Sequence, residues 1–363
     1  MATTIKPFSS RIFNLTSLKT HVLLQRAYST IKYPINQTKP HHFLTTADFS
    51  AEQLYELVNR AIQFKIEAKY EKKTTDKPLT GKTLALIFSK RSTRTRVATE
   101  SAMTYLGGHS MFLGSQDIQL GVNESLLDTS RVVSSMVDGI MARAGESTVP
   151  VINALSDKYH PTQILADLMT LHEHIHHRSQ SATKGQYTAH MQHPRETLPG
   201  LRIAWVGDAN NILQEMLVSF PKLGISVAAA CPSGYTCAED IVAIAKSDSK
   251  KTGAQILFTT KPDEAVKDAD VIVTDTWISM GQEAEKARRL NEFKGYQVTM
   301  EMAKRAGAKP DWAFMHCLPR KQEEVDDEVF YSDRSLVFTE AENRKWTILS
   351  VLDTFIVKGG VSN

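Results

Sequence analysis

Residues 82–108 read KTLALIFSKRSTRTRVATESAMTYLGG and contain an apolar run, a polar turn and a helical segment in succession. The apolar run, residues 82–88, has the length and composition of a buried strand. The segment after the turn ends at Gly107-Gly108, and glycine is a frequent helix terminator. A strand followed by a helix, repeated along a chain, is typical of a parallel sheet with helices on both faces. This stretch therefore predicts an α/β fold.

The same alternation of strand and helix patterns extends over most of the chain. Before residue 174 it predicts a helix capped by Ser50, strands at 138–144 and 149–155, and a helix that begins at Pro161, the position in a helix that proline favours. The polar stretch 174–199 predicts a loop or insertion. Beyond it we expect strands at 201–207, 226–231, 255–260, 270–275 and 312–318, helices that begin near Asn211, Ala238 and Pro262, and a closing amphipathic helix at 340–357. This order indicates two α/β domains, each with a parallel sheet, and a terminal helix.

Basic residues are distributed unevenly along the chain. The 363 residues carry a formal net charge of +3, yet residues 1–47 contain no Asp or Glu and many Ser and Thr. This composition is typical of a mitochondrial transit peptide, and we predict cleavage between Tyr28 and Ser29. A basic tail that binds nucleic acid is the alternative. Removal of residues 1–28 leaves a nearly neutral chain, which argues against a large basic surface for nucleic acid.

The cysteine and histidine content argues against a disulfide-bonded protein and against a metal site. The three cysteines, Cys231, Cys237 and Cys317, do not form the pattern of a disulfide framework and suit a reducing compartment. Cys231 follows the apolar run SVAAA and is expected to be a buried small side chain. The histidines of HEHIHH (172–177) could bind zinc, but they lead into a polar stretch without a defined ligand geometry, so we predict no metal site. No apolar run has the length of a membrane-spanning helix.

The turn after the first strand has a high density of positive charge. Lys90, Arg91, Arg94 and Arg96 are interleaved with serine and threonine hydroxyls. A helix N-terminus presents free N–H groups to an anion, and arginine pairs with phosphate through two N–H groups. The alternative is a solvated helix start with surface arginines, in which four cations would repel one another. Because the spacing matches neither glycine-rich nucleotide motif, we predict a site for a small phosphorylated ligand.

Four motifs give the chain a resemblance to a known family. They are SKRSTRTR (89–96), HPTQILAD (160–167), DTWISMG (275–281) and HCLPR (316–320), and the resemblance extends from about His41 to Val357. The chain resembles the aspartate/ornithine carbamoyltransferase family, its ornithine branch in particular. This implies transfer of the carbamoyl group of carbamoyl phosphate to the side-chain amine of L-ornithine, giving L-citrulline and phosphate in arginine biosynthesis. It also implies a homotrimer in the mitochondrial matrix, without a cofactor.

The resemblance implies a division of the chain. After a transit peptide at 1–28, residues 41–175 would bind carbamoyl phosphate and residues 200–339 would bind ornithine, while the helix 340–358 would return to the first domain. Gln119 stands where some relatives carry histidine, on a loop that in the family reaches the active site of a neighbouring subunit. Glutamine can still donate a hydrogen bond to phosphate.

The family's carbamoyl phosphate residues match ten positions of this chain. These are Ser92, Thr93, Arg94, Thr95, Arg143, His160, Gln163, Cys317, Leu318 and Arg344. Attack on the carbamoyl carbon puts negative charge on its oxygen, which fixed arginine and histidine donors stabilise. We therefore expect Arg143 and His160 to be catalytic. Taken singly, His160 would be a helix cap before Pro161 and Arg344 a surface residue of the last helix.

The family's ornithine residues match Asn211, Asp275, Ser279 and Met280. Asn211, Asp275 and Cys317 each follow a predicted strand, and open α/β sheets bind ligands beyond the carboxyl ends of their strands. The attacking amine has an ordinary pKa of about 10.4 and must lose a proton before it reacts. Cys317, with an ordinary thiol pKa of about 8.5, is the family's proton acceptor and matches that task better than Asp275, which would neutralise the ammonium. A purely positioning role for Cys317 remains open.

Two other functions are compatible with the same fold. The first is a catalytically silent binding protein, but the joint presence of Arg94, Arg143, His160, Asp275 and Cys317 argues against it. The second is an enzyme with another amine acceptor, such as aspartate. Aspartate would require additional cations near the second domain, and the DTWISMG and HCLPR motifs favour ornithine.

Overall fold

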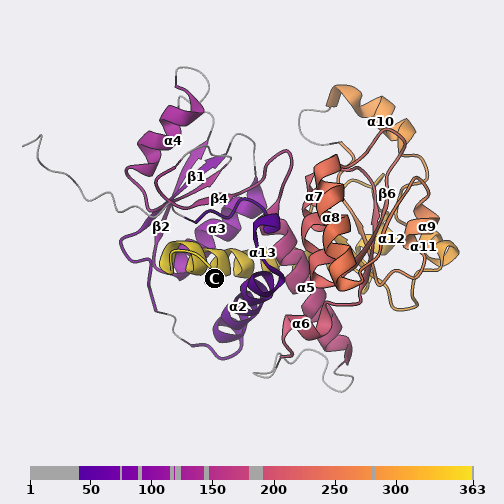
Figure 1. Ribbon diagram of the computed structural model, residues 1–363, viewed down its shortest axis with the longest axis horizontal. Helices are drawn as coiled ribbons and strands as arrows, with labels where there is room; N and C mark the ends of the chain where they lie inside the picture. The colour runs from indigo at the N-terminus through magenta and orange to yellow at the C-terminus, as the bar shows by residue number, and fades with distance from the viewer. Residues whose placement is uncertain are drawn as a thin grey trace, which may run out of the picture. The chain divides into compact units, whose positions relative to one another are not determined.

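Two parallel β-sheets, each flanked by helices, make up the described part of the chain (Figure 1). The structure is a computed structural model, and it describes residues 41–73, 76–88, 92–114, 118, 124–142, 147–179, 191–278 and 283–361. The predicted transit peptide, 1–28, lies outside these residues. The predicted α/β fold with two parallel sheets is confirmed.

The first sheet has the strand order β2-β1-β3-β4. Its strands are β1 (Thr83–Phe88), β2 (His109–Gly114), β3 (Gly139–Ala142) and β4 (Val151–Asn153). The helical elements of this half are η1 (Thr46–Asp48), α2 (Ala51–Lys69), α3 (Thr93–Tyr105), α4 (Leu126–Ser134) and α5 (Pro161–Ser179). The sequence patterns do not indicate β2 and α4, because β2 is an edge strand with no fully buried residue and α4 is a helix of only nine residues. Strand order reverses between β1 and β3, which makes the carboxyl end of β1 a position where ligands bind in such sheets.

The second sheet has the order β7-β6-β5-β8-β9. Its strands are β5 (Arg202–Val206), β6 (Ser226–Ala230), β7 (Ile256–Thr259), β8 (Val271–Thr274) and β9 (Ala313–His316). The helices of this half are α6 (Pro194–Thr197), α7 (Asn211–Ser219), α8 (Glu239–Thr252), α9 (Pro262–Val266), α10 (Lys286–Glu292), α11 (Met300–Ala306) and α12 (Asp327–Phe330), with 3-10 turns η2 (Pro221–Leu223) and η3 (Glu283–Glu285). Here the order reverses between β5 and β8, so the ends of β5, β8 and β9 are neighbours at one edge.

The predicted loop at 174–199 is partly wrong. Helix α5 continues to Ser179, and α6 forms at Pro194–Thr197, while residues 180–190 lie outside the described residues. The histidines extend the helix because two of them face inward. The His172 and His176 rings are buried and stack with their centroids 6.1 Å apart, and the hydroxyl of Thr197 lies 2.6 Å from Nδ1 of His172.

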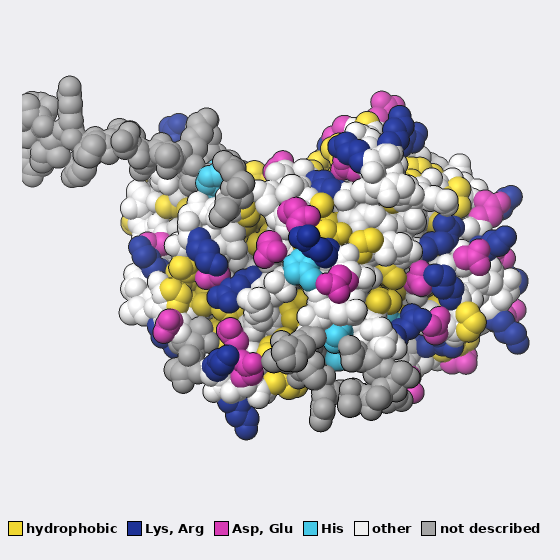
Figure 2. Space-filling model, turned by 60° about the horizontal axis from the view of Figure 1, so that its bottom comes forward, with side chains coloured by type: hydrophobic (Ala, Val, Ile, Leu, Met, Phe, Trp, Pro, Cys, Tyr) yellow, Lys and Arg dark blue, Asp and Glu magenta, His cyan; other side chains and the backbone are white. Residues whose placement is uncertain are grey.

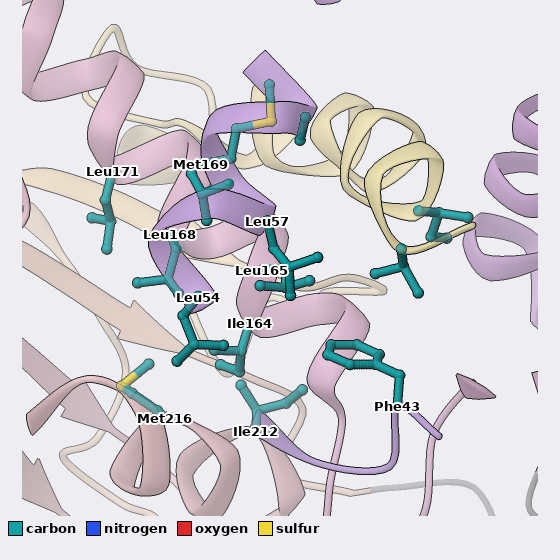
Figure 3. Close-up of a cluster of buried hydrophobic side chains, with 14 of the residues drawn as sticks. Phe43, Leu54, Leu57, Ile164, Leu165, Leu168, Met169, Leu171, Ile212 and Met216 are labelled. Carbon is teal, nitrogen blue, oxygen red and sulfur yellow. The ribbon is translucent and has the colours of Figure 1, made fainter. Parts of the chain in front are cut away.

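The last helix packs among the first helices of the chain. α13 (Val337–Leu352), which continues as a π-helical turn (Asp353–Val357), contacts α2, α3 and α5 (Figure 1). Apolar side chains from α2, α5 and α7 pack together in the core (Figure 3), including Leu54, Leu57, Ile164, Leu165, Leu168, Ile212 and Met216. Full burial of one such side chain contributes about 1.5–3 kcal/mol to stability. The return of the C-terminal helix thus belongs to the hydrophobic core.

A buried ion pair reinforces this packing. Nζ of Lys65, on α2, lies 2.9 Å from Oε2 of Glu173, on α5, and the two side chains are each 3% exposed. Asn343, on α13, accepts from Lys65 through Oδ1 (2.8 Å) and donates to Glu173 through Nδ2 (3.0 Å). The three helices are therefore joined by a lysine, a glutamate and an asparagine that pair with one another through hydrogen bonds.

Charged side chains of both signs are mixed over the face drawn in Figure 2. That face therefore does not present an extended field of one sign to a polyanion. Within the described ranges, every helix is too short or too polar to cross a membrane.

The Glu173→Gln variant tests the buried ion pair. The substitution removes the carboxylate that pairs with the buried Lys65 ammonium, and removal of one partner of a buried pair costs about 3–5 kcal/mol. We expect the free energy of unfolding in urea to fall by that amount. The matched control is Glu342→Gln, because Glu342 of α13 also pairs with a lysine of α2, Lys69 (2.7 Å), but with 42% of each side chain exposed. Its loss is expected to cost under about 1 kcal/mol; equal losses in the two variants would contradict this account.

Candidate active site

The predicted site residues lie at the carboxyl ends of strands. Ser92 is the N-cap of α3 after β1, and Thr93, Arg94 and Thr95 form the first turn of that helix. In the second sheet Asp275 follows β8 and Cys317 follows β9. Because parallel strands end at the same edge, Asp275 and Cys317 are brought side by side.

Cys317 and Asp275 are in direct contact. Sγ of Cys317 donates a hydrogen bond to Oδ1 of Asp275 (2.8 Å). The other carboxylate oxygen accepts from Nδ2 of Asn210 (2.6 Å). The pKa of Cys317 is raised well above the ordinary thiol value, mainly by burial and secondly by the negative charge of Asp275. The ordinary pKa used in the sequence argument therefore does not apply to this arrangement, in which Cys317 is a protonated donor.

The HCLPR segment bends back toward α3. Leu318 has a φ of +59°, which is rare for a non-glycine residue, and its carbonyl accepts a hydrogen bond from Nη2 of Arg94. His316 stabilises the bend, since its Nδ1 accepts from the backbone N–H of Leu318 (2.9 Å) and its Nε2 lies 3.2 Å from the carboxylate of Glu324. Arg94 of the first half and the Cys317 segment of the second half thus meet in one site.

Arg344 reaches this site from the last helix. Its guanidinium is 2% exposed and donates to Oε1 of Gln163 (2.7 Å) and to the hydroxyls of Thr95 (3.0 Å) and Thr162 (3.1 Å). Nε of Arg344 has no hydrogen-bond partner among the described residues. The pKa of Arg344 is lowered to about 10, mainly by burial and secondly by the positive charge of Arg94. Arg344 therefore remains a cation at neutral pH. A buried cation whose direct partners are neutral favours an anionic ligand.

His160 is a neutral residue in this arrangement. It is buried, and burial together with the charges of Arg344 and Arg94 lowers its pKa well below the ordinary histidine value. Its backbone N–H donates to Oε2 of Glu215 (3.1 Å), a carboxyl group of α7. Oε1 of Glu215 accepts from the Thr45 hydroxyl (3.0 Å) and the Thr46 N–H (2.6 Å), and burial raises the pKa of Glu215 to about 7.

Asn211 occupies a different place from its neighbour Asn210. Nδ2 of Asn211 donates to the carbonyl of Ser156 (2.7 Å), which belongs to the segment after β4. Asn210 caps α7 through the N–H of Ile212 (3.0 Å) and contacts Asp275. Of the two asparagines, the one that hydrogen-bonds to Asp275 is therefore Asn210, which the family motifs did not single out.

Several predicted residues lie outside the described part of the chain. They are Arg143, Gln119, Ser279 and Met280, together with Lys90 and Arg91 of the basic turn. Arg94, Thr95, His160, Gln163, Asp275, Cys317, Leu318 and Arg344 form one connected region, and Ser92 and Thr93 lie at its edge on α3.

Sequence reasoning missed five polar residues that hold this region together. They are Asp167, Asn210, Glu215, Glu324 and Glu340. The available signal was an acidic residue inside an apolar helical run, as in ILADLM and ILQEMLV. A charged residue at such a position is buried only when it is paired.

Only one group of side chains in the described ranges has the spacing of a metal site. Ligand atoms of Asp275, His316 and Cys317 lie within 4.8 Å of one another. Both ring nitrogens of His316 are engaged, with Leu318 and with Glu324, so the group does not offer a free imidazole. The HEHIHH histidines form no such group in the described residues, and burial lowers the pKa of His172 to about 3.

Comparison with known proteins identifies the class. The model of the aspartate/ornithine carbamoyltransferase carbamoyl-P binding domain matches residues 41–173, and that of the Asp/Orn binding domain matches residues 199–355. These ranges cover most of the chain and include the region described above. The chain belongs to the aspartate/ornithine carbamoyltransferase family.

Relatives within the family are closely similar over their whole length. The mitochondrial ornithine carbamoyltransferase of Coccidioides immitis is 52% identical over 335 residues, covering 88% of this chain and 94% of the relative. That of Emericella nidulans is 50% identical, covering 92% and 94%. A crystal structure of the Coccidioides immitis enzyme matches with a TM-score of 0.77 at 48% identity, covering 89% of this chain and 99% of that one. The Pyrococcus furiosus ornithine carbamoyltransferase structure also has a TM-score of 0.77, at 40% identity and covering 90% and 100%.

Alkylation of Cys317 tests its protonation state. Because burial and Asp275 raise the pKa of the thiol, we expect the rate of modification by iodoacetamide in the ligand-free protein to keep rising above pH 9. Asp275→Asn removes the negative charge and should accelerate the reaction at pH 8 by about tenfold for each unit by which the pKa falls.

Peptide mass spectrometry resolves this reaction from that of Cys237, the internal control. Burial, with a smaller contribution from the charge of Asp208, raises the pKa of Cys237 to about 12. Because Asp275 does not contribute to this rise, the alkylation rate of Cys237 should not respond to Asp275→Asn. A wild-type Cys317 rate that levels off below pH 8 would contradict the assignment.

Proposed function

We propose that this carbamoyltransferase transfers the carbamoyl group of carbamoyl phosphate to the side-chain amine of L-ornithine, giving L-citrulline and phosphate as a step of arginine biosynthesis. The observation that carries the proposal is the meeting of Arg94, Arg344 and the Cys317–Asp275 pair in one buried region. Two cations suit the phosphorylated donor, while a carboxylate suits the ammonium of the acceptor. The names of the relatives and the two matched domain models support the same substrates.

The division of labour between the two halves is also a proposal. Residues 41–175 would bind carbamoyl phosphate, residues 200–339 would bind ornithine, and the helix 340–358 would return Arg344 to the first domain. The family models, which match 41–173 and 199–355, support this division. The first sheet ends at α3 and the second at Asp275, so each substrate would bind at the edge of a separate sheet.

The phosphate of the donor is proposed to bind at the start of α3. Ser92, Thr93, Arg94 and Thr95 supply hydroxyls, a guanidinium and the free N–H groups of a 13-residue helix. His160, Arg143 and Arg344 would stabilise the negative charge that develops on the carbamoyl oxygen. A neutral His160 donates one N–H to that oxygen without adding a third positive charge. Gln163 would accept from the carbamoyl NH₂, and Leu318 and Cys317 would line the other side.

The acceptor amine is proposed to enter beside Asp275. Its ammonium replaces the thiol as the partner of the carboxylate, and the added positive charge lowers the pKa of Cys317 from its raised value. The thiol then releases its own proton to solvent, and the ammonium gives a proton to the resulting thiolate. The neutral nitrogen forms a bond to the carbamoyl carbon, and the bond from that carbon to the phosphate oxygen breaks, its electron pair leaving with the phosphate. The proton that the new C–N bond releases leaves with the phosphate. Asn211, Ser279 and Met280 would hold the amino-acid end of ornithine.

Cellular location and assembly complete the proposal. The acid-free composition of residues 1–47 and the mitochondrial names of the relatives place the chain in mitochondria, and we propose the matrix. We also propose a homotrimer in which the loop with Gln119 reaches a neighbouring site. Large apolar side chains are exposed on α3, on β2 and on α4 with the turn that follows it, namely Val97, Met111, Leu127, Val132 and Met136. A second copy of the chain would cover them.

Citrulline formation tests the function. Wild-type protein given carbamoyl phosphate and a panel of amines is expected to carbamoylate ornithine preferentially. Arg94→Ala removes a charged hydrogen bond to phosphate, worth about 1.5–3 kcal/mol, and should raise the KM for carbamoyl phosphate by about tenfold to a hundredfold. Arg96→Ala, in the same motif, is the control, because Arg96 pairs with Glu100 (2.8 Å) on the exposed face of α3. Equal effects of the two substitutions, or preference for another amine, would overturn the proposal.

The exposed apolar residues predict the behaviour of assembly variants. Val132→Glu and Met136→Glu place a charge among side chains that a partner subunit would bury, so the combined variant should sediment as a smaller species than the wild type, which should have the mass of three chains. Ala243→Glu adds the same charge at an exposed position of α8 and should leave the mass unchanged. A wild type that sediments as a monomer would refute the trimer.

A further inference from the structure

Two buried acids lie beside Gln163. Asp167 of α5 and Glu340 of α13 are each 2% exposed and are hydrogen-bonded to each other. Nε2 of Gln163 donates to both, to Oδ1 of Asp167 (2.9 Å) and to Oε1 of Glu340 (2.7 Å). Two carboxyl groups form a hydrogen bond only if one of them keeps a proton.

The environment keeps one proton on the pair at neutral pH. Burial raises the pKa of Asp167 to about 7 and raises that of Glu340 well above its ordinary value, and the repulsion between the two acids adds to the rise for Glu340. Two ionised carboxylates in contact would repel each other strongly in a buried site. The pair therefore carries a single negative charge, which faces the cation of Arg344.

The count of N–H donors assigns the shared proton to Asp167. Both oxygens of Glu340 already accept a separate N–H, since Oε1 accepts from Gln163 and Oε2 accepts from the backbone N–H of His316 (3.1 Å). Among the described residues, Gln163 donates an N–H to Oδ1 of Asp167, and Oδ2 is therefore left to carry the proton. We place the proton on Asp167 because both oxygens of Glu340 already accept an N–H.

This arrangement determines which way the Gln163 amide points. Its NH₂ group is directed at the two acids, so its Oε1 faces Arg344, from whose Nη1 it accepts a hydrogen bond of 2.7 Å. A carbonyl oxygen has two lone pairs, so Oε1 can accept a second donor. A flipped Gln163 would instead present NH₂ to the ligand. The pair therefore selects a ligand that carries an N–H donor at this position.

We propose that Asp167 and Glu340, joined by one shared proton, are positioning residues that hold Oε1 of Gln163 toward the NH₂ of the carbamoyl donor. Through the N–H of His316, Glu340 also holds the start of the Cys317 segment. The inference rests on the proposed function. It adds that discrimination between a carbamoyl and an acetyl donor depends on the two acids to which Gln163 donates its hydrogen bonds. A site built to pair with a substrate N–H rejects an analogue that lacks it.

Two isosteric variants with opposite expected outcomes test this inference. In Asp167→Asn, Oδ1 still accepts from Gln163 and the amide N–H replaces the shared proton, so the KM for carbamoyl phosphate should stay within about threefold of wild type. In Glu340→Gln, the new NH₂ must face either Gln163 or His316, both of which are donors. We expect the KM for carbamoyl phosphate to rise by about tenfold or more, the change that corresponds to about 1.4 kcal/mol.

Acetyl phosphate as an inhibitor separates positioning from general damage. It has a methyl group in place of NH₂, so its inhibition constant should change by less than about threefold in either variant, and thermal melting should confirm that both are folded. Equal effects of the two substitutions, or equal weakening of carbamoyl and acetyl phosphate in Glu340→Gln, would overturn the inference while the wild type still forms citrulline. Failure of the wild type itself to form citrulline would overturn the proposed function and this inference with it.

Discussion

The buried guanidinium of Arg344 is the constraint on which the site depends. A charged group inside a protein is costly unless its hydrogen bonds and its charge are satisfied. Thr95, Thr162 and Gln163 accept its hydrogen bonds but carry no charge, so within the described residues its charge is offset through space by the Asp167–Glu340 pair, and Nε is left without a hydrogen-bond partner. The protein places this cation there by packing its last helix among its first, so the hydrophobic core and the anion site are built by the same contacts. An anionic donor that binds at α3 would complete the arrangement.

Buried acids connect the segments of the chain that surround the site. Glu215 joins the segment before α2 to the backbone of His160, and Glu324 joins His316 to the N–H of Trp277 in the segment that contains Asp275. Each acid accepts from groups that belong to different segments of the chain. Since hydrogen bonds are directional, these acids fix the relative positions of the segments more closely than apolar packing does. The substrate-binding side chains therefore rest on a second set of residues that no motif marks.

The sequence predicted the α/β class and the strands of the second sheet, because each depends on a local pattern of apolar and polar residues. The return of the last helix was implied by the resemblance to the family. It did not predict β2, α4 or the end of α5, where an edge strand, a short helix and inward-facing histidines disturb that pattern. Family motifs led to Arg94, Gln163, Asp275, Cys317 and Arg344, which the structure brings together. The partners of the acids around them were not predictable, because the pairing that makes their burial possible joins positions far apart in the chain. For the same reason the ordinary pKa of Cys317 was a poor guide: the neighbouring Asp275 is 42 positions away.

The central claim is that one cationic region binds the carbamoyl donor, while residues at the carboxyl edge of the second sheet bind the acceptor amine. Its most direct test is a crystal structure of the protein with carbamoyl phosphate and an ornithine analogue that lacks the side-chain amine. The account predicts the phosphate against Ser92–Thr95, the carbamoyl nitrogen within hydrogen-bond distance of Oε1 of Gln163, and Arg344 in contact with the donor. A donor bound away from the start of α3, or one with its nitrogen turned from Gln163, would contradict it.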